Sequence, residues 1–362
     1  MAGGMAHQPW RPSQVLTNAA LALLAGREDS AALARQSGHR DAAALGRALR
    51  RELFITPEAL SRLGRDGQYT IAYGGPFHVA QTLRYLGRDP ENLAERVDGP
   101  SYRRLFPVGG RNVPATLILG KNGCRVELGG ALDPAGKLAL HCIVVRGLGL
   151  DQPLRAFYRH VRGHAVMEPL VKSLRGVTVP QVPSLWEGLC WAIIGQQINL
   201  SFAYRLRNRL IALCSSARAP YRPPYPFPTP EQVLKIPPPA WREAQFSRQK
   251  TDYLIGLART YTDGRLCEQT LRDAPDEAVE STLLAIRGLG SWSVAYGLLR
   301  AFGRIDALPV GDAGLRTALM RHYNLPAPPD SKQQGALMES CRPYRGLATY
   351  YLWKSLDRLR QE

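Results

Sequence analysis

The stretch from residue 286 to residue 312 combines a glycine turn with an acid, and both features can do chemistry. It reads IRGLGSWSVAYGLLRAFGRIDALPVGD. Gly288 and Gly290 have no Cβ, so the backbone there can turn sharply and lie close to another surface. The first N–H groups of a helix that begins near Ser291 have no partner inside the helix, and they can bind a phosphate. Asp312 follows in a loop that contains proline and glycine.

Asp312 offers a carboxylate about twenty residues after the turn. A carboxylate in such a loop can stabilise a positive charge on a substrate, and it can orient or deprotonate a water molecule. Residues 313–320 have a helix-like pattern, so Asp312 is also suited to be the N-cap of a helix. The two roles are compatible with each other.

Three regions with different patterns surround this stretch, at residues 1–66, 67–176 and 177–362. Apolar and polar residues alternate in the second region as they do in strands. The third region has helical patterns after the sequence VPQVP, interrupted once where prolines cluster in a loop. We expect a small α+β domain with an antiparallel sheet in front of a mainly helical domain. Expected strands lie at residues 69–73, 114–119, 124–128 and 138–145, a helix at 77–86 and the loop at 215–230.

The first region contains helix-like runs on either side of Gly38. Apolar residues recur there at helical spacing, for example at Leu45 and Leu49. The segment at residues 30–63 resembles the helix-turn-helix of the AraC-type transcription regulators, although it holds one such unit where that family carries two. The segment is therefore either a degenerate remnant with a structural role or a reader of DNA sequence.

The charge of the chain is strongly positive. Lysine and arginine number 47 against 30 acidic residues, which gives a net charge of +17 and a pI near 9.9. Such a balance favours a polyanion as partner, and nucleic acid is the commonest one. Most of the basic residues are arginines, which fits phosphate contact and equally fits the composition of a GC-rich genome.

The six cysteines do not form a metal-binding pattern, because none lies within five residues of another. This spacing argues against a zinc ribbon or a clustered iron–sulfur site. No run approaches the length of a membrane-spanning helix, and the first residues, MAGGMAHQPW, show no secretory signal pattern. We expect a cytoplasmic protein without a cofactor and without a metal held by side chains.

Residues 286–312 resemble the helix-hairpin-helix and the aspartate loop of the DNA base-excision glycosylases. The second and third regions together resemble the bacterial 3-methyladenine DNA glycosylase II family, with several motifs in the same order. This resemblance implies a helical catalytic domain of two lobes with the active site in the cleft between them. The supporting motifs are Tyr69-Thr70, WAIIGQQ at 191–197, FPTP at 227–230, LPVGD at 308–312 and RPYRGLATYYLW at 342–353.

The resemblance assigns the catalytic carboxylate to Asp312. Breaking an N-glycosidic bond builds positive charge on the sugar, which a nearby carboxylate stabilises. The same resemblance places Trp292, Tyr296 and Trp353 in the base pocket, together with Tyr85 from the second region. Electron-rich rings favour a base that alkylation has made cationic, by about 0.5–2 kcal/mol for each contact.

DNA contacts are expected at the hairpin, where backbone N–H groups would hold phosphates without reading sequence. A monovalent cation on backbone carbonyls near Gly288 is implied by the relatives. The hairpin residues that we assign to DNA binding are Arg287, Gly288, Leu289, Gly290 and Ser291.

Three further residues outside the hairpin are assigned to DNA contact. Gln196 and Gln197 match the motif beside which relatives insert a side chain into the gap left by a flipped base. That wedge is apolar in the best-known pattern, whereas Gln197 is polar and is also suited to stabilise a helix start. Arg345 either contacts a phosphate or pairs with an acid.

Bifunctional relatives of the endonuclease III and 8-oxoguanine types place a lysine at or near the position of Trp292, where it forms a Schiff base with the sugar. This chain has no lysine between Lys250 and Lys332. A lyase step therefore lacks a nucleophile. The pattern predicts a monofunctional glycosylase and argues against an 8-oxoguanine-type lyase.

These observations and the resemblance predict a DNA glycosylase of base excision repair, cytoplasmic and associated with the nucleoid, and the resemblance implies that it acts as a monomer. Its partner would be double-stranded DNA that contains alkylated or deaminated purines. The preference among 3-methyladenine, 7-methylguanine and hypoxanthine stays open. The alternative is a DNA-binding regulator, or a non-catalytic damage sensor, of an alkylation response.

Overall fold

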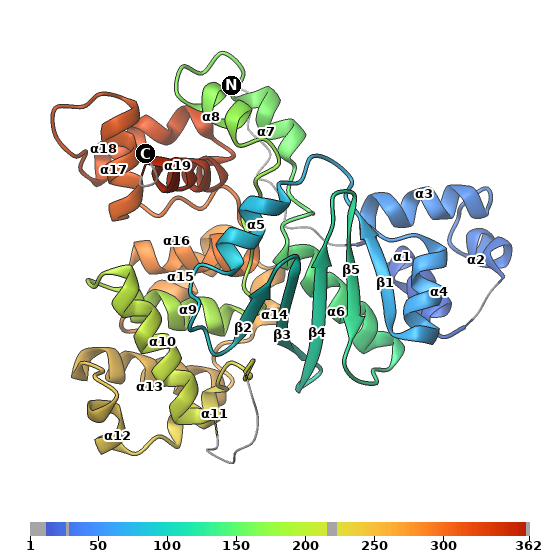
Figure 1. The fold of residues 1–362 in the computed structure, drawn as a ribbon, viewed down its shortest axis with the longest axis horizontal. Coiled ribbons are helices and arrows are strands. Elements are labelled where there is room, and N and C mark those ends of the chain that lie inside the picture. Colours follow the sequence, from blue (N-terminus) through green and yellow to red (C-terminus); the bar gives the residue numbers. More distant parts are fainter. Residues whose placement is uncertain (1–11, 27–28, 216–222, 360–362) are drawn as a thin grey trace. The chain divides into compact units, whose positions relative to one another are not determined.

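The computed structural model describes residues 12–26, 29–215 and 223–359, and they form two compact units (Figure 1). The sheet unit holds the described residues between 12 and 151 together with 223–227. The helical unit holds residues 152–215 and 228–359. The predictions for the first ten residues and for residues 216–222 of the loop lie outside the described residues. Residues 223–229 of that loop contain no helix or strand, as predicted.

A five-stranded antiparallel sheet, in the order β1-β5-β4-β3-β2, forms the centre of the sheet unit. The strands predicted at 69–73, 114–119 and 124–128 are confirmed as β1, β4 and β5, and the helix predicted at 77–86 is α5. Cross-strand partners such as Tyr69 and Val126 are both buried, because alternate residues of a strand share a face. The strands are β1 Gln68–Ala72, β2 Glu95–Asp98, β3 Ser101–Val108, β4 Arg111–Leu119 and β5 Gly123–Leu128.

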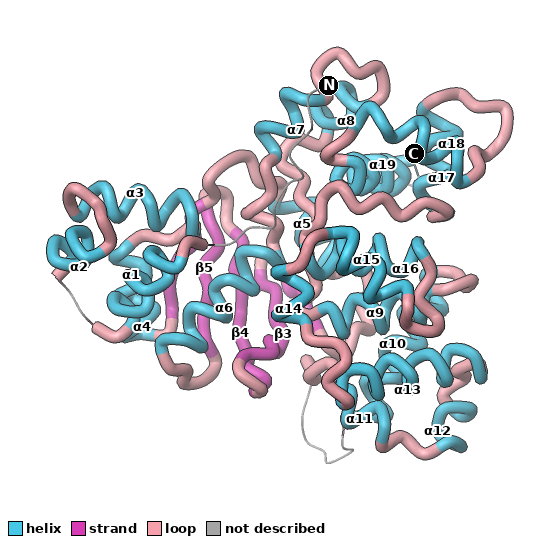
Figure 2. The backbone as a smooth tube through the Cα atoms, turned by 180° about the vertical axis from the view of Figure 1, so that it is seen from behind, coloured by secondary structure: helices cyan, strands magenta, loops and turns pink. Residues whose placement is uncertain are grey.

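The prediction of a strand at residues 138–145 is wrong, because this segment lies inside helix α6, Pro134–Gly147. Asp133 caps the helix, and Pro134 stands in the first turn, where its missing N–H is not needed. A short apolar run fits a buried strand and a buried helix equally well, so the pattern alone did not decide. Figure 2 shows α6 lying across one face of the sheet.

Four helices from the first region lie beside β1 (Figure 1). The short helices predicted around Gly38 are confirmed as α2 and α3, and Gly38 itself has a φ of 72°. Leu49 and Leu53 belong to the same hydrophobic core as Ile71 of β1, so this region has a structural role. Its link to AraC-type regulators stays a prediction. The helices of the sheet unit are α1 Gln14–Leu24, α2 Ser30–Gln36, α3 Ala42–Leu53, α4 Pro57–Asp66, α5 Val79–Leu86 and α6.

The helical unit contains helices in two groups, as the resemblance predicts (Figures 1 and 2). One group contains α7, α8 and α17–α19, and the other contains α9–α13 with α15 and α16. None of the helices in the described ranges is long and apolar enough to cross a bilayer. The bounds are α7 Leu154–His160, α8 Met167–Ser173, α9 Leu185–Gly195, α10 Leu200–Cys214, α11 Pro230–Leu234, α12 Pro238–Glu243, α13 Arg248–Thr262, α14 Glu268–Asp273, α15 Asp276–Leu284, α16 Ser291–Gly297, the π-helix η1 Leu298–Phe302, α17 Ala313–His322, α18 Ser331–Met338, the 3-10 helix η2 Glu339–Cys341 and α19 Arg345–Leu359.

Candidate active site

Asp312 is the N-cap of α17, and its Oδ1 accepts a hydrogen bond from the N–H of Leu315 at 2.8 Å. The loop before it is held by the buried side chain of Gln334. The Oε1 of Gln334 accepts from the N–H of Gly311 at 2.9 Å, and its Nε2 donates to the carbonyl of Pro329 at 3.0 Å. Gly311 has a φ of 85°, a conformation that favours glycine. The position of the carboxylate is therefore fixed by a hydrogen bond to the residue before it, Gly311, and by its own hydrogen bond to Leu315, after it.

Two tryptophans donate hydrogen bonds to the Asp312 carboxylate. The Nε1 of Trp353 donates to Oδ1 at 2.8 Å, and the Nε1 of Trp292 donates to Oδ2 at 3.0 Å. Trp353 lies on α19 and Trp292 on α16, so Asp312 lies where the two groups of helices meet. An ionised carboxylate has about four acceptor positions. Because Oδ2 has one donor among the described residues, it keeps a position for water or a reacting group.

The aromatic side chains around Asp312 contact each other. The ring centroids of Trp292 and Tyr296 are 5.5 Å apart in a stacked arrangement, and those of Tyr296 and Trp353 are 6.4 Å apart. All three residues are half-buried, so part of each ring stays accessible. Buried Tyr350 supports Trp353 edge-on at 6.3 Å. The structure thus brings three of the four predicted pocket aromatics together with Asp312.

Tyr85, the fourth predicted pocket residue, lies on α5 of the sheet unit. The guanidinium carbon of Arg88 lies 3.9 Å from the centroid of its ring. This cation covers one face of the ring, in a geometry that is itself favourable. A place for Tyr85 in the base pocket stays a prediction.

The hairpin between α15 and α16 has the predicted sharp turn at Gly288, whose φ is 98°. A Cβ at this position would lie 2.3 Å from the ring of Tyr253, so glycine is required. Gly290 has a φ of −94° and open space where a Cβ would be. No side chain caps the N-terminus of α16, and Ser291 is exposed there. Leu289 is buried, so it can contribute only its backbone to a DNA contact.

Gln196 and Lys250 connect the hairpin to helix α9. The Nε2 of Gln196 donates to the carbonyl of Gly288 at 2.8 Å and to the hydroxyl of Ser293 at 3.0 Å. The Nζ of Lys250 donates to the carbonyls of Ile193 and Gln196 at 3.0 and 2.7 Å. Burial lowers the pKa of Lys250. Gln196 therefore positions the hairpin from inside the protein, in addition to its predicted place near DNA.

The segment from Gln197 to Leu200 directly follows Gln196 and has exposed side chains. Gln197 is exposed and has a φ of 54°, which strains a residue that has a Cβ. The cap of the next helix is Asn199, which accepts from the N–H of Phe202 at 2.8 Å, and not Gln197. Leu200 is 55% exposed, which is unusual for so large an apolar side chain.

Arg345 forms an ion pair, which was one of its two predicted roles. Its Nε and NH2 donate to the two carboxylate oxygens of Asp306 at 3.0 and 2.7 Å. A bidentate pair of this kind holds the guanidinium in place. Arg287 is exposed, in contrast, and forms no ion pair with an acid in the parts of the chain that the structure describes. Of the two arginines, Arg287 is the better candidate for a phosphate.

Across residues 12–26, 29–215 and 223–359, no three His, Cys, Asp or Glu side chains gather as metal ligands. The backbone carbonyl of Gly288 has a second acceptor position beside the Gln196 bond, so it fits the monovalent cation that the resemblance implies. That cation stays a prediction.

Sequence reasoning missed three residues that matter for this site. Gln334 and Lys250 act through backbone groups that are distant in sequence, and nothing in their local pattern signals this. Leu200 had a signal, because it follows the capping residue Asn199 directly. An apolar residue in the first turn of a helix, close to a motif expected to contact DNA, is a candidate for insertion between bases.

Comparison with known proteins supports one family. Residues 190–343 match the HhH-GPD superfamily of base excision DNA repair proteins. The putative DNA-3-methyladenine glycosylase YfjP of Bacillus subtilis (strain 168) is 32% identical over 290 residues, which are 78% of this chain and 96% of that protein. A second protein of that strain, named DNA-3-methyladenine glycosylase, is 29% identical over 285 residues, 77% of this chain and 94% of its own length.

The fold agrees with these relatives. The 3-methyladenine DNA glycosylase of Archaeoglobus fulgidus superposes with a TM-score of 0.69 at 20% identity, covering 81% of this chain and 99% of that one. The relatives carry the names of enzymes, so the comparisons favour the glycosylase over a regulator or a sensor. The chain therefore belongs to the DNA-3-methyladenine glycosylases, a family of the HhH-GPD superfamily of base excision DNA repair proteins.

Proposed function

We propose that this chain is a monofunctional glycosylase that removes alkylated purines from double-stranded DNA, with Asp312 as its catalytic carboxylate. One observation carries the proposal most directly. Asp312 accepts hydrogen bonds from two tryptophans and still has an acceptor position on Oδ2. The half-buried aromatic rings beside it offer faces on which a base can stack. We expect the enzyme to act as a monomer.

The chemistry follows from this arrangement. Hydrolysis breaks the bond between C1′ of the sugar and the nitrogen of the base, and the base leaves with the bonding electrons. The positive charge that develops at the sugar is stabilised by the Asp312 carboxylate. A water molecule on Oδ2 then bonds to C1′, and the carboxylate accepts its proton. The tryptophan donors keep the carboxylate oriented while the charge develops.

The aromatic set favours lesions that carry a positive charge. Purines alkylated at N3 or N7 are cationic, whereas hypoxanthine is neutral. Cation–π attraction to Trp292, Tyr296 and Trp353 would add roughly 0.5–2 kcal/mol for each ring in contact. A cationic base also leaves the sugar more readily. We therefore rank 3-methyladenine and 7-methylguanine above deaminated purines as substrates.

DNA binding is proposed at the hairpin and at the segment 197–200. No side chain caps the N-terminus of α16, so its first N–H groups have no side-chain acceptor there, which suits a phosphate. Carbonyl oxygens near Gly288 would hold a monovalent cation, which would neutralise phosphate charge. Gln197 and Leu200 are both exposed, and we assign the filling of the gap left by the flipped base to this pair.

Lysine chemistry argues for a simple hydrolase. The lysine next to the hairpin is Lys250, and its Nζ is buried and bonded to two carbonyls. It cannot attack the sugar without leaving both acceptors unpaired. The product would therefore be an abasic site in an intact strand.

The test is release of bases from methylated duplex DNA by wild type and by Asp312→Asn, with products separated by chromatography. Strands are examined before and after alkali. The proposal expects methylpurine release by wild type, loss of at least about a hundredfold in the variant, and strand breaks only after alkali. If Asp312→Asn released bases as fast as wild type, the Asp312 carboxylate would not be catalytic. Breaks before alkali, with a borohydride-trapped adduct, would show a lyase.

A further inference from the structure

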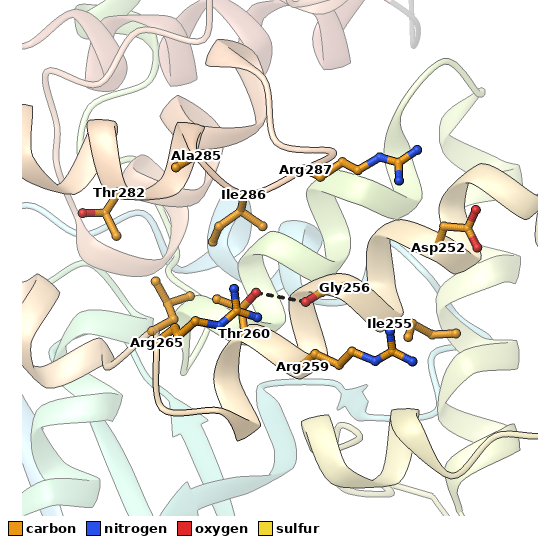
Figure 3. A pocket seen from close by; sticks show the side chains of 11 residues that line it. Asp252, Ile255, Gly256, Arg259, Thr260, Arg265, Thr282, Ala285, Ile286 and Arg287 are labelled. Atoms are coloured by element: carbon orange, nitrogen blue, oxygen red, sulfur yellow. Dashed lines mark hydrogen bonds between the residues drawn. The ribbon is translucent and has the colours of Figure 1, made fainter.

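A second pocket lies in the helical unit between α13 and the start of the hairpin. Its volume is about 690 Å³, a size typical of ligand-binding pockets. Residues 252–266 line one side and residues 282–287 the other (Figure 3). We call this pocket the arginine groove, after Arg259, Arg265 and Arg287.

The arginine groove is separate from the proposed active site. Asp312 and the aromatic residues around it do not line the groove. The shared boundary is Arg287, which lies on the hairpin next to Gly288. The proposed glycosylase chemistry therefore leaves this pocket without a role.

The groove has an apolar floor. Ile255, Leu266, Ala285 and Ile286 line it, and Ile255 and Ile286 are half-buried with part of their surface open. Such a surface gains free energy when apolar groups of a ligand cover it.

The rim of the groove is basic. Three arginines line it against one carboxylate, Asp252. Arg265 pairs with exposed Asp263 at 3.0 Å, a contact that contributes little in solvent. Neither Arg259 nor Arg287 has an ion pair with an acidic side chain in the described part of the chain. The groove therefore offers two unpaired guanidinium groups, and these prefer carboxylates or phosphates as partners.

We propose that the arginine groove binds an acidic peptide segment of a partner protein, with apolar side chains on the floor and carboxylates on the rim. A DNA backbone satisfies the arginines, but it has no apolar side chain to fill the floor at Ile255 and Ile286. A peptide that combines both residue types matches both surfaces, and this proposal does not depend on the proposed catalytic mechanism.

The test uses the full chain and a fluorescein-labelled peptide of sequence Asp-Glu-Phe-Asp-Glu-Leu-Asp, followed by fluorescence anisotropy. We expect a Kd below about 100 μM. The double variant Arg259→Glu/Arg265→Glu should weaken binding by about tenfold or more, because it reverses two charges of the rim. Ala285→Trp should weaken it similarly by filling the floor. The matched control is Arg155→Glu, an exposed arginine on α7, which should stay within about twofold.

Two further ligands separate the possible outcomes. A peptide with serine at both apolar positions should bind about tenfold more weakly, since the floor is then uncovered. Equal binding of the serine peptide, or equal binding by all variants, would reduce the effect to general charge attraction and overturn the proposal. An undamaged duplex is the second ligand. If the rim variants weaken duplex binding and the peptide does not bind, the groove is a DNA surface. Melting curves and single-turnover base release show that each variant is folded.

Discussion

The oxygens of Asp312 have different surroundings. Oδ1 accepts from Leu315 and Trp353, whereas Oδ2 accepts from Trp292. Oδ2 is therefore the oxygen that can face a reacting group. In the proposed active site each tryptophan would have two roles, because it would offer a ring face to a base while its N–H group donates to the acid.

Replacing either tryptophan by phenylalanine separates these roles. Trp353→Phe and Trp292→Phe keep an aromatic ring and remove one hydrogen bond to the carboxylate. A hydrogen bond to a charged group contributes about 1.5–3 kcal/mol, so we expect single-turnover excision to slow by about 10- to 100-fold. Affinity for damaged duplex should change less. Tyr296→Phe, which keeps its ring and both indole donors, is the control, and equal losses in all three variants would contradict the assignment.

The sequence predicted these residues better than it predicted their contacts. The turn at Gly288, the helix at Ser291 and the cap at Asp312 follow from local backbone preferences, and all three are present. The indole bonds to Asp312 join α16 and α19, which are distant in sequence. No local pattern encodes such a contact, so the sequence could not reveal it.

At the scale of elements, the hairpin offers a matched pair of glycines. Gly288→Ala places a Cβ against Tyr253 at a positive φ, so we expect a loss of about 2 kcal/mol in the free energy of unfolding. Gly290→Ala meets no atom inside the protein and should leave unfolding unchanged. It should still weaken duplex binding if DNA approaches the hairpin closely. Urea denaturation and anisotropy on duplex DNA measure the two effects, and a stable Gly288→Ala protein would contradict this account.

Helix α6 contains a buried histidine that makes the sheet unit sensitive to acid. The Nε2 of His141 donates to the carbonyl of Leu53 at 2.6 Å, and its Nδ1 accepts from the hydroxyl of Tyr69 at 2.9 Å. Burial lowers the pKa of His141 from 6.5 to about 4. Between these two pH values the unfolded chain binds a proton and the folded chain does not. The free energy of unfolding therefore falls as the pH drops from 6.5 to 4, by at most about 3.4 kcal/mol.

The variant His141→Gln removes this titration. We expect it to be less stable than wild type at pH 7, because two buried hydrogen bonds are disturbed. Its stability should then depend less steeply on pH between 4 and 6.5. Urea denaturation across this range measures the slope, with His160→Gln as the control at an exposed histidine. A slope equal to that of wild type would show that His141 is not the group responsible.

Helix α6 also shows where reasoning from the sequence reached its limit. The apolar run at residues 138–145 was predicted as a strand, although Asp133 and Pro134 mark a helix start. Strands β1, β4 and β5 were found because polar and apolar residues alternate clearly. Strand β2 has only four residues, and β3 contains two adjacent arginines, of which Arg104 is buried although charged residues are usually exposed.

At the scale of the whole molecule, the described residues 12–26 and 29–66 belong to the fold of the sheet unit. The buried leucines of α1, α3 and α4 pack into one core with β1 and α6. Lys137 of α6 also donates to the carbonyl of Gly64 at 2.6 Å. These helices are therefore part of the structure, whatever else they do.

A chain shortened to residues 67–362 tests this conclusion. Removing four helices exposes part of the apolar core of the sheet unit. The free energy lost in this way exceeds the usual net stability of a domain, about 5–15 kcal/mol. We expect the sheet unit to lose its cooperative melting, as followed by calorimetry and near-ultraviolet circular dichroism. Arg47→Glu/Arg50→Glu, which changes two exposed side chains of α3, is the matched control and should melt as wild type does. A shortened chain that melts cooperatively would show that the helices are a separate appendage.

The bonds of Gln196 have a consequence for how DNA is searched. Its side chain holds Gly288, its carbonyl is held by Lys250, and the next residue begins the exposed segment 197–200. The hairpin and this segment are thus connected through the hydrogen bonds of one residue, Gln196. If both touch DNA as proposed, this connection sets the distance between their two contacts on the duplex. Once the hairpin binds a phosphate, it inspects base pairs at one fixed offset along the duplex, and the protein must step to inspect the next.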